Sequence, residues 1–312
     1  MKKVDPEFIK VIRNAKKNEK LVFFLGAGVS MAQGYPDWNG YVRHLIEYWK
    51  YNLASINDGE SNQVGWVKKL DWLEQQENIT NARKIDILHY LIEENSTAKI
   101  KDTDKDYLLQ YEQEWFEKAV PVTKNNSILH SLVSLNGSYI TTNYDLEIEK
   151  SVAGFGYDEI NSLEKAKVGR FAVGNGPYVI HLHGTPKAGF ESFINSAADY
   201  SNLYYKQSSS HYEGVNEFIR GKVIVFIGSS LQEDEILSNL DLKEAHAYAL
   251  MKGYGDDLSN QMIEDYYKNK KNIEIIWYGD TYDELPTYLS RVVDEVIVQY
   301  RRNSRMEEGI LE

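Results

Sequence analysis

The chain has 312 residues, a formal net charge of −12 and no cysteine. The negative charge argues against nucleic acid or an anionic membrane as a direct partner, and the lack of cysteine excludes disulfides, thiol nucleophiles and cysteine-ligated zinc. No apolar run approaches the ~18 residues of a transmembrane helix, and the N-terminus has no signal-peptide pattern, so we expect a cytoplasmic protein.

Short apolar runs predict buried strands, and four of them end in glycine, where a strand passes into a loop. The runs are 21–26, 138–143, 178–184, 222–228, 245–251 and 273–279. Continuous apolar runs separated by helical stretches are typical of a parallel sheet that is covered on both faces. We therefore predict a Rossmann-like α/β fold with a mainly parallel sheet of about six strands.

The segment between the first two strands predicts helices. Apolar residues recur with helical spacing at Val42, Leu45, Ile46 and Trp49, then around residues 85–92 and again around 129–133. This segment is longer than an ordinary strand-to-strand crossover, so we predict a helical insertion over residues 40–136. Its polar stretch 56–63 predicts a loop, and the whole of 1–312 is expected to form one domain.

Two glycines, Gly26 and Gly28, follow the first predicted strand. Such a turn lets backbone amides approach an anion at the start of a helix, as in diphosphate-binding folds. The third glycine of the dinucleotide fingerprint is missing, because Met31 stands in its position. A tight turn without a ligand therefore remains an equal alternative at this point.

A larger set of motifs resembles the sirtuin family. "GAGVSMAQGYPDW" (26–38) resembles the family's glycine signature, although Asn39 replaces the arginine that ends it. "TTNYD" (141–145), "HLHG" (181–184), "GSSL" (228–231) and "YGDTYDEL" (278–285) resemble further sirtuin motifs in the same order. The variant "TTNYD", the insertion and "DYSNLY" (199–204) look more like bacterial sirtuin-like domains of anti-phage defence than like deacylases.

The resemblance implies NAD⁺ as the substrate and assigns roles to individual residues. Asn143 would position the ribose or the attacking water, and His183 would act as the catalytic base. Asp145 would hold the nicotinamide carboxamide. The residues implied in cofactor binding are Gly26, Ala27, Gly28, Ser30, Asp37, Asp145, Gly228, Ser229 and Asp280.

Structural roles are the alternatives for these residues. Asn143 could cap a helix that begins at Tyr144, Asp145 could be a first-turn carboxylate, and Ser30 could be a helix cap. His181 and His183 are expected on one face of a strand, about 6.6 Å apart, with His183 at its mouth and a pKa near ~6.5. This pair could hold zinc, but no third ligand is suggested and we expect no metal.

Three functions from different classes follow. The first is an NAD⁺ glycohydrolase that depletes NAD⁺ in anti-phage defence, and the second is an NAD-dependent protein deacylase. The third is a non-catalytic subunit that senses NAD⁺ or ADP-ribose. Sirtuin deacylases carry a four-cysteine zinc module, which this chain cannot form, so hydrolysis is favoured. Because NAD⁺ hydrolysis is toxic, we expect control through a homo-oligomer or a separately encoded sensor or ATPase.

Overall fold

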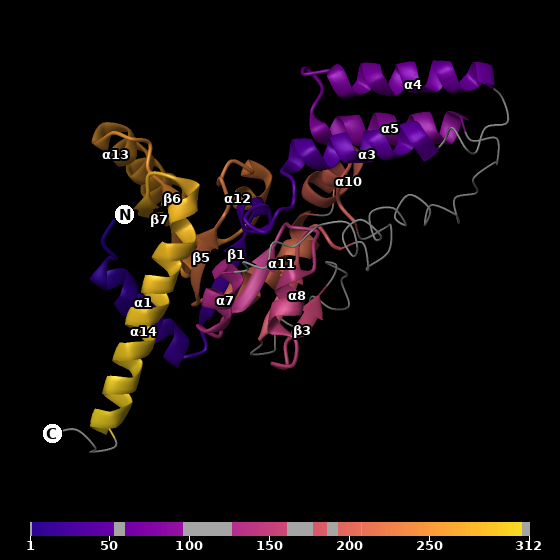
Figure 1. The fold of residues 1–312 in the computed structure, drawn as a ribbon. Helices are drawn as coiled ribbons and strands as arrows, with labels where there is room; N and C mark the ends of the chain where they lie inside the picture. Colours follow the sequence, from indigo (N-terminus) through magenta and orange to yellow (C-terminus); the bar gives the residue numbers. More distant parts are fainter. Residues whose placement is uncertain are drawn as a thin grey trace.

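The strands of the chain form a parallel sheet. A computed structural model describes residues 2–52, 60–95, 127–160, 177–185, 193–206 and 208–307. Within these residues the sheet has seven strands in the order β3-β4-β2-β1-β5-β6-β7, and every neighbouring pair is parallel (Figure 1). The strands are β1 (Leu21–Leu25), β2 (Ser138–Thr141), β3 (Asp158–Ile160), β4 (Tyr178–His181), β5 (Val223–Ile227), β6 (His246–Lys252) and β7 (Ile273–Gly279).

This sheet confirms the predicted Rossmann-like α/β class. The predicted number of about six strands missed β3, a three-residue edge strand of sequence Asp-Glu-Ile that pairs only with β4 among the described strands. Its first two residues are exposed, so β3 lacks the apolar run by which the other six strands were recognised.

Both faces of the sheet are buried, as the continuous apolar runs require. In β1, Leu21, Phe23 and Leu25 join the core on one face, whereas Val22 and Phe24 join the core on the other. The first face packs against α1 (Pro6–Lys17), α7 (Ser127–Val133), α8 (Glu147–Val152) and α14 (Leu285–Glu307). The second packs against the π-helices η6 (Asn202–Lys206) and η8 (Tyr267–Lys271), and against α11 (Ser208–Ile219), α12 (Asp234–Asn239) and α13 (Asp257–Tyr266).

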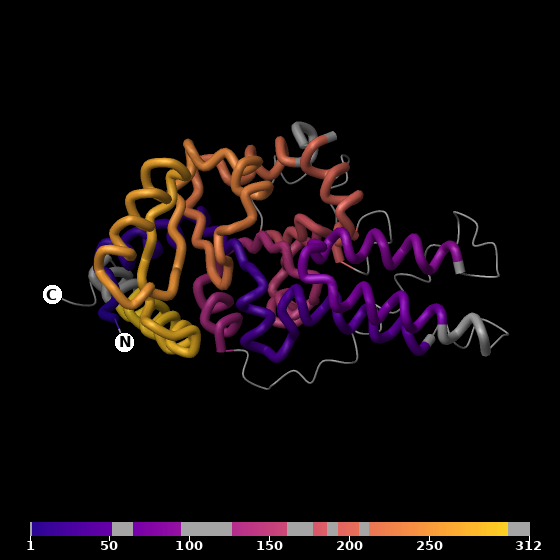
Figure 2. Tube along the Cα trace, turned by 90° about the horizontal axis from the view of Figure 1, so that it is seen from above, coloured from indigo at the N-terminus to yellow at the C-terminus, as the bar shows by residue number. Residues whose placement is uncertain are grey.

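Three helices between β1 and β2 form a separate layer with a core of its own. They are α3 (Trp38–Asn52), α4 (Glu60–Gln75) and α5 (Asn81–Asn95), and Figure 2 shows them extending together beyond the sheet. Their buried residues include Leu45, Leu70 and Leu88. We call α3, α4 and α5 the helical layer.

The helical layer departs from the sequence prediction in two respects. Residues 60–63, which were predicted as part of a loop, form the first turn of α4, whereas 53–59 lie outside the described residues. Helix α7, which was predicted within the insertion, packs against the sheet, because its Ile128, Leu129 and Leu132 lie in the core of that face.

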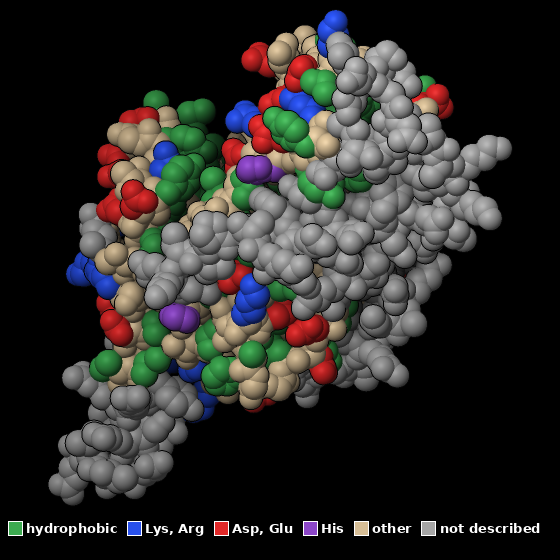
Figure 3. Space-filling view, turned by 45° about the vertical axis from the view of Figure 1, so that its right-hand side comes forward, with side chains coloured by type: hydrophobic (Ala, Val, Ile, Leu, Met, Phe, Trp, Pro, Cys, Tyr) green, Lys and Arg blue, Asp and Glu red, His purple; other side chains and the backbone are tan. Residues whose placement is uncertain are grey.

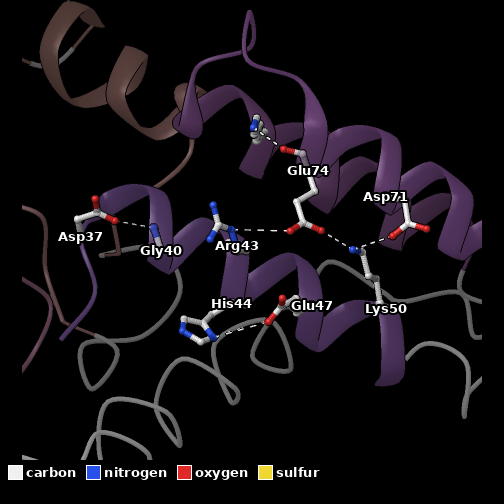
Figure 4. A network of polar contacts seen from close by, with 9 residues as sticks. Asp37, Gly40, Arg43, His44, Glu47, Lys50, Asp71 and Glu74 are labelled. Atoms are coloured by element: carbon white, nitrogen blue, oxygen red, sulfur yellow. Dashed lines mark hydrogen bonds and ion pairs between the residues drawn. The ribbon is translucent and has the colours of Figure 1, made fainter. Parts of the chain in front are cut away.

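Ion pairs fasten α3 to α4 on the outside of the helical layer. Lys50 of α3 contacts both Asp71, at 2.8 Å, and Glu74 of α4, and Arg43 lies 3.8 Å from Glu74 (Figure 4). Figure 3 shows Lys and Arg side chains interspersed with Asp and Glu side chains over this layer. Because these pairs are at or near the surface, each contributes little to stability, on the order of 0–1 kcal/mol.

The strand order fixes where a ligand can bind. From β1 the chain passes to β2, β3 and β4 on one side, and then returns to β5, which pairs with β1 on its other side. In open parallel sheets a crevice forms at the carboxyl ends of strands where the order reverses in this way. In the part of the chain that the structure describes, no helix is long and apolar enough to cross a membrane.

Candidate functional site

A cavity of about 690 Å³ lies at the carboxyl ends of β1, β2, β4 and β5. Residues from the loops after these four strands form one part of its wall, and residues from the helical layer and α10 (Ala197–Ser201) form the other. Its lining residues are Ala27, Ser30, Tyr35, Pro36, Asp37, Trp38, Tyr41, Thr80, Asn81, Ala82, Arg83, Thr142, Asn143, Tyr144, Asp145, His183, Ala197, Tyr200, Ser201, Tyr205, Glu233, Glu235 and Ile236.

The glycines after β1 allow the backbone to approach the loop after β5 closely. A Cβ atom on Gly26 would lie 2.7 Å from the carbonyl oxygen of Gly228, and one on Gly28 would lie 2.9 Å from the same oxygen. The Gly26 amide donates to the Ile227 carbonyl at 3.0 Å, and the Gly28 amide donates to the Gly228 carbonyl at 2.8 Å. Both glycines therefore have a structural role, and their amides are directed at the protein rather than at a ligand.

The loop after β2 is held against β1 by a chain of hydrogen bonds that ends at Asn143. The Thr141 hydroxyl donates to the Leu25 carbonyl at 2.8 Å and accepts from the Asn143 amide at 3.0 Å. The Asn143 side-chain nitrogen Nδ2 donates to the Gly26 carbonyl at 3.0 Å. An amide NH₂ has two hydrogens, so the Oδ1 acceptor and the second N–H of Nδ2 remain to contact a ligand in the cavity.

Asp145 is buried in the wall of the cavity and connects its loop to α2 (Ala27–Met31) and α8. Its Oδ2 accepts from the Ser30 hydroxyl at 2.5 Å, and its Oδ1 accepts from the Glu147 amide at 3.0 Å. Burial raises the pKa of the Asp145 carboxyl, although the hydrogen bond from Ser30 opposes this shift. Ser30 thus supports Asp145 and does not cap a helix. Since α8 begins at Glu147, Asn143 does not cap a helix at Tyr144 and Asp145 precedes the first turn.

His181 lies deeper and contacts the loop that carries Asn143. Its Nδ1 lies 2.8 Å from the Asn143 carbonyl oxygen and its Nε2 lies 2.7 Å from Oε1 of Glu149 in α8. Burial alone would lower the pKa of His181, but the hydrogen bond and charge of Glu149 and the Asn143 carbonyl together raise it. Because a carbonyl and a carboxylate both accept, this arrangement suits a doubly protonated imidazolium.

His183 lines the cavity and is enclosed by tyrosines. Its Nε2 lies 2.5 Å from the Tyr204 hydroxyl, which in turn accepts from Tyr212 at 3.2 Å, and its Nδ1 lies 3.5 Å from the Tyr200 hydroxyl. The side chain is 2 % exposed, and burial lowers the pKa of His183 to about 3. The imidazole is therefore neutral at physiological pH, with a pKa well below the ~6.5 expected from the sequence.

The two histidines do not share a face, which corrects the expectation from strand alternation. Strand β4 ends at His181, and the chain turns at once through Gly184, which has φ of 72°. His181 therefore contacts Glu149 of α8, on one face of the sheet, whereas His183 contacts Tyr204, in the core of the opposite face. His183 is the histidine of the pair that reaches the cavity.

Some of the residues predicted to bind the cofactor or to act in catalysis line the cavity. Ala27, Ser30, Asp37, Asn143, Asp145 and His183 line it. Asp37 also accepts from the Gly40 amide at 2.7 Å, at the start of α3. Gly26, Gly28, Gly228 and Ser229 lie directly behind this wall, in contact with one another. Asp280 does not line the cavity, since it follows β7, which is separated from β5 by β6.

Several lining residues were not predicted. Glu233 and Glu235 come from the start of α12, and desolvation together with the charge of Glu235 raises the pKa of Glu233. Arg83 comes from α5, far from any recognised motif. Asn39, which stands where the sirtuin signature has arginine, accepts from Asn81 of α5 at 2.7 Å. Glu233, Glu235 and Arg83 belong to no motif, so only the folded arrangement identifies them.

Metal binding finds no support among the residues that the structure describes. No group of three or more His, Asp or Glu side chains there is arranged to hold a metal ion. His181 and His183, which were considered as a possible pair of ligands, contact opposite sides of the sheet.

A comparison with known protein families matches the part of the chain that carries β2 to β6 and about half of the residues that line the cavity. Residues 137–276 match the family model of the SIR2-like domain. The matched range includes Asn143, Asp145, His183 and Gly228, and it begins after the glycine turn and the helical layer. Members of this family are NAD-dependent enzymes. The chain therefore carries a sirtuin-like domain.

Proposed function

We propose that this protein hydrolyses the N-glycosidic bond of NAD⁺ to give nicotinamide and ADP-ribose. The observation that carries the proposal is the meeting of Asn143, Asp145 and His183 on one cavity, at the carboxyl ends of parallel strands in a SIR2-like domain. The cavity is within the size range of ligand sites, which is about 300–1,000 Å³.

The reaction requires little acid catalysis, because nicotinamide leaves from a cationic ring. The bond between C1′ of the ribose and the ring nitrogen breaks, and neutral nicotinamide departs with the electron pair. Water then bonds to C1′ and loses one proton. Asn143 Oδ1 would orient the water or a ribose hydroxyl, and Asp145 would accept from the carboxamide of nicotinamide.

His183 would receive the proton. A base must be unprotonated before it reacts, and burial among tyrosines keeps His183 neutral over the whole physiological range. A pKa of about 3 also makes His183 a weak base, so it would take the proton as the bond to C1′ forms, when the attacking water becomes strongly acidic. Nε2 of His183 is hydrogen-bonded to Tyr204, whereas Nδ1 has only a long contact with Tyr200, at 3.5 Å. Nδ1 is therefore the nitrogen that could accept the proton, once the proton of the imidazole has moved to Nε2.

Two observations favour hydrolysis over deacylation. Glu233 and Glu235 bring carboxylates to the cavity wall, and an uncharged acyl chain packs poorly against carboxylates. The chain also has no cysteine, so it lacks the means to form the four-cysteine zinc module of sirtuin deacylases. We therefore propose a role as an NAD-depleting effector, as in anti-phage defence.

Identification of the products tests this proposal. The purified protein is incubated with NAD⁺, with and without an acetyl-lysine peptide, and the products are resolved by chromatography and mass spectrometry. We expect nicotinamide and ADP-ribose in equal amounts in both reactions. O-acetyl-ADP-ribose that forms only with the peptide would instead establish a deacylase, and intact NAD⁺ bound to the protein would favour a sensing subunit.

Control by assembly remains a prediction. The helical layer exposes three large aromatic side chains, Tyr51, Trp72 and Tyr90, at 77 %, 53 % and 59 % of their surface. A homo-oligomer or a separately encoded sensor or ATPase would be expected to cover such side chains. Light scattering that gives a monomer with full activity would contradict this prediction.

A further inference from the structure

The wall of the cavity carries an excess of negative charge. Four carboxylates line it, from Asp37, Asp145, Glu233 and Glu235. Among the described lining residues, Arg83 is the one lysine or arginine. A diphosphate carries two negative charges, so its binding beside these carboxylates requires a cation to offset the repulsion.

Arg83 lies at the rim of the cavity and can offer N–H donors to a ligand there. One guanidinium nitrogen, Nη1, lies 3.0 Å from Oδ2 of Asp86, and 62 % of the side-chain surface is exposed. A guanidinium has five N–H donors, so a single contact with Asp86 leaves most of them for a ligand. Asp86 therefore positions the guanidinium and leaves most of its N–H donors available to a ligand.

The first two turns of α5, which carry Arg83 and Asp86, are bonded to the elements on both sides of them. Asn81 donates from Nδ2 to Oδ1 of Asn39 in α3 at 2.7 Å. Asp86 accepts through Oδ1 from the Ala198 amide in α10 at 3.2 Å. Ala197 and Ser201 of α10 also line the cavity. These hydrogen bonds fix the position of the helix that carries Arg83 at the cavity rim.

We infer that Arg83 binds the diphosphate group of the dinucleotide. The inference rests on the proposed ligand, NAD⁺, and assigns the helical layer a direct part in binding it. Arginine pairs with phosphate oxygens through two parallel N–H donors, which gives both attraction and orientation. Free nicotinamide, which is uncharged and has no phosphate, makes no such demand on Arg83.

Calorimetric titration with ADP-ribose and, separately, with nicotinamide tests the inference. The variants are Arg83→Ala, Arg83→Gln and the control Arg43→Ala. Arg43 is a matched control because it lies in the same helical layer, has 65 % of its side chain exposed, is paired with a carboxylate (Glu74 at 3.8 Å) and does not line the cavity. Circular dichroism checks that each variant is folded.

Both Arg83 variants should bind ADP-ribose about 10- to 100-fold more weakly than the wild type, and nicotinamide equally well. Their affinity for ADP-ribose should also depend less on salt concentration, whereas Arg43→Ala should match the wild type in every respect. Unchanged ADP-ribose affinity in folded Arg83 variants would overturn the inference, as would an equal loss in Arg43→Ala.

Failure of the inference is separate from failure of the proposed function. A wild-type protein that binds ADP-ribose through Arg83 but leaves NAD⁺ intact would support the inference and contradict the hydrolase. A wild-type protein that hydrolyses NAD⁺ with Arg83 variants of unchanged ADP-ribose affinity would do the reverse.

Discussion

The Tyr204 hydroxyl lies 2.5 Å from Nε2 of His183, and Tyr212 donates to the Tyr204 hydroxyl from behind. With Tyr212 donating to the Tyr204 oxygen, we expect Tyr204 to donate its own hydrogen to His183. The imidazole then carries its proton on Nδ1, which faces Tyr200. This relationship favours the Nδ1–H tautomer in the ligand-free protein, so His183 can act as the base at Nδ1 only after its proton moves to Nε2.

Tyr204→Phe tests the tautomer. Removal of the hydroxyl takes a hydrogen bond from the neutral imidazole, so the pKa of His183 should rise from about 3 and its preference for one tautomer should weaken. Nitrogen-15 NMR of the histidine rings reports both effects. Tyr205→Phe is the control, since Tyr205 lines the cavity and is 73 % exposed. An Nε2–H tautomer in the wild type would refute the assignment.

His183 should make the protein sensitive to acid. Its folded pKa of about 3 lies below the 6.5 of an unfolded histidine, so between these values the unfolded state binds more protons. The free energy of unfolding should therefore fall as pH falls from 6.5, by up to ~1.4 kcal/mol per pH unit from this residue. Urea denaturation from pH 7 to pH 4.5 should show a shallower fall in His183→Gln. Parallel curves for the two proteins would show that His183 is not buried in this way.

Glu149→Gln should destabilise the protein by removing the contribution that His181 makes to stability at low pH. Because the folded pKa of His181 is raised, its contribution to stability is complete below pH 6.5 and is lost as pH rises through the folded value. Oε2 of Glu149 is buried without a hydrogen-bond partner among the described residues, so a glutamine amide nitrogen there would be unpaired. We expect a loss of about 1–3 kcal/mol below pH 6.5, measured by urea denaturation. Wild-type stability across this range would mean that the ion pair contributes nothing.

Gly26→Ala should destabilise the protein through backbone contacts alone. The new Cβ would lie 2.7 Å from Gly228 O and from Ser229 Cα. Both are backbone atoms, so neither can move away by a change of side-chain rotamer. Overpacking of this kind costs about 1–3 kcal/mol. Gly65→Ala is the matched control: Gly65 lies within α4 with nothing within 4 Å of its Cβ position, so it should gain about 0.5–1 kcal/mol. A neutral Gly26→Ala would contradict the close approach of the two loops.

The parts of the fold that the sequence predicted are those with a strong local pattern. The apolar run of β1 and the glycines after it identify a buried strand and its turn, and strand ends then bring Asn143 and His183 to one edge of the sheet. The first turn of α4 was predicted as loop because residues 60–63 are mostly polar, and its buried residues, Trp66, Leu70 and Leu73, come later in the helix.

The remaining features depend on contacts between distant segments. Glu149 meets His181 across 32 positions, and Arg83 reaches the cavity from a helix with no motif. The pKa of His183 depends on burial among tyrosines that follow it by about 20 residues. No local spacing encodes any of these relationships, so they required the structure.

The rate of nicotinamide release from NAD⁺ by the wild type, Asn143→Ala and His183→Ala tests the central claim most directly. ADP-ribose binding and circular dichroism verify that each variant is folded and binds, and His181→Ala, which should lose stability before turnover, serves as the comparison. We predict release by the wild type and a loss of at least about 100-fold in both Asn143→Ala and His183→Ala. Wild-type rates in folded Asn143→Ala and His183→Ala, or no release by a wild type that binds NAD⁺, would contradict the account.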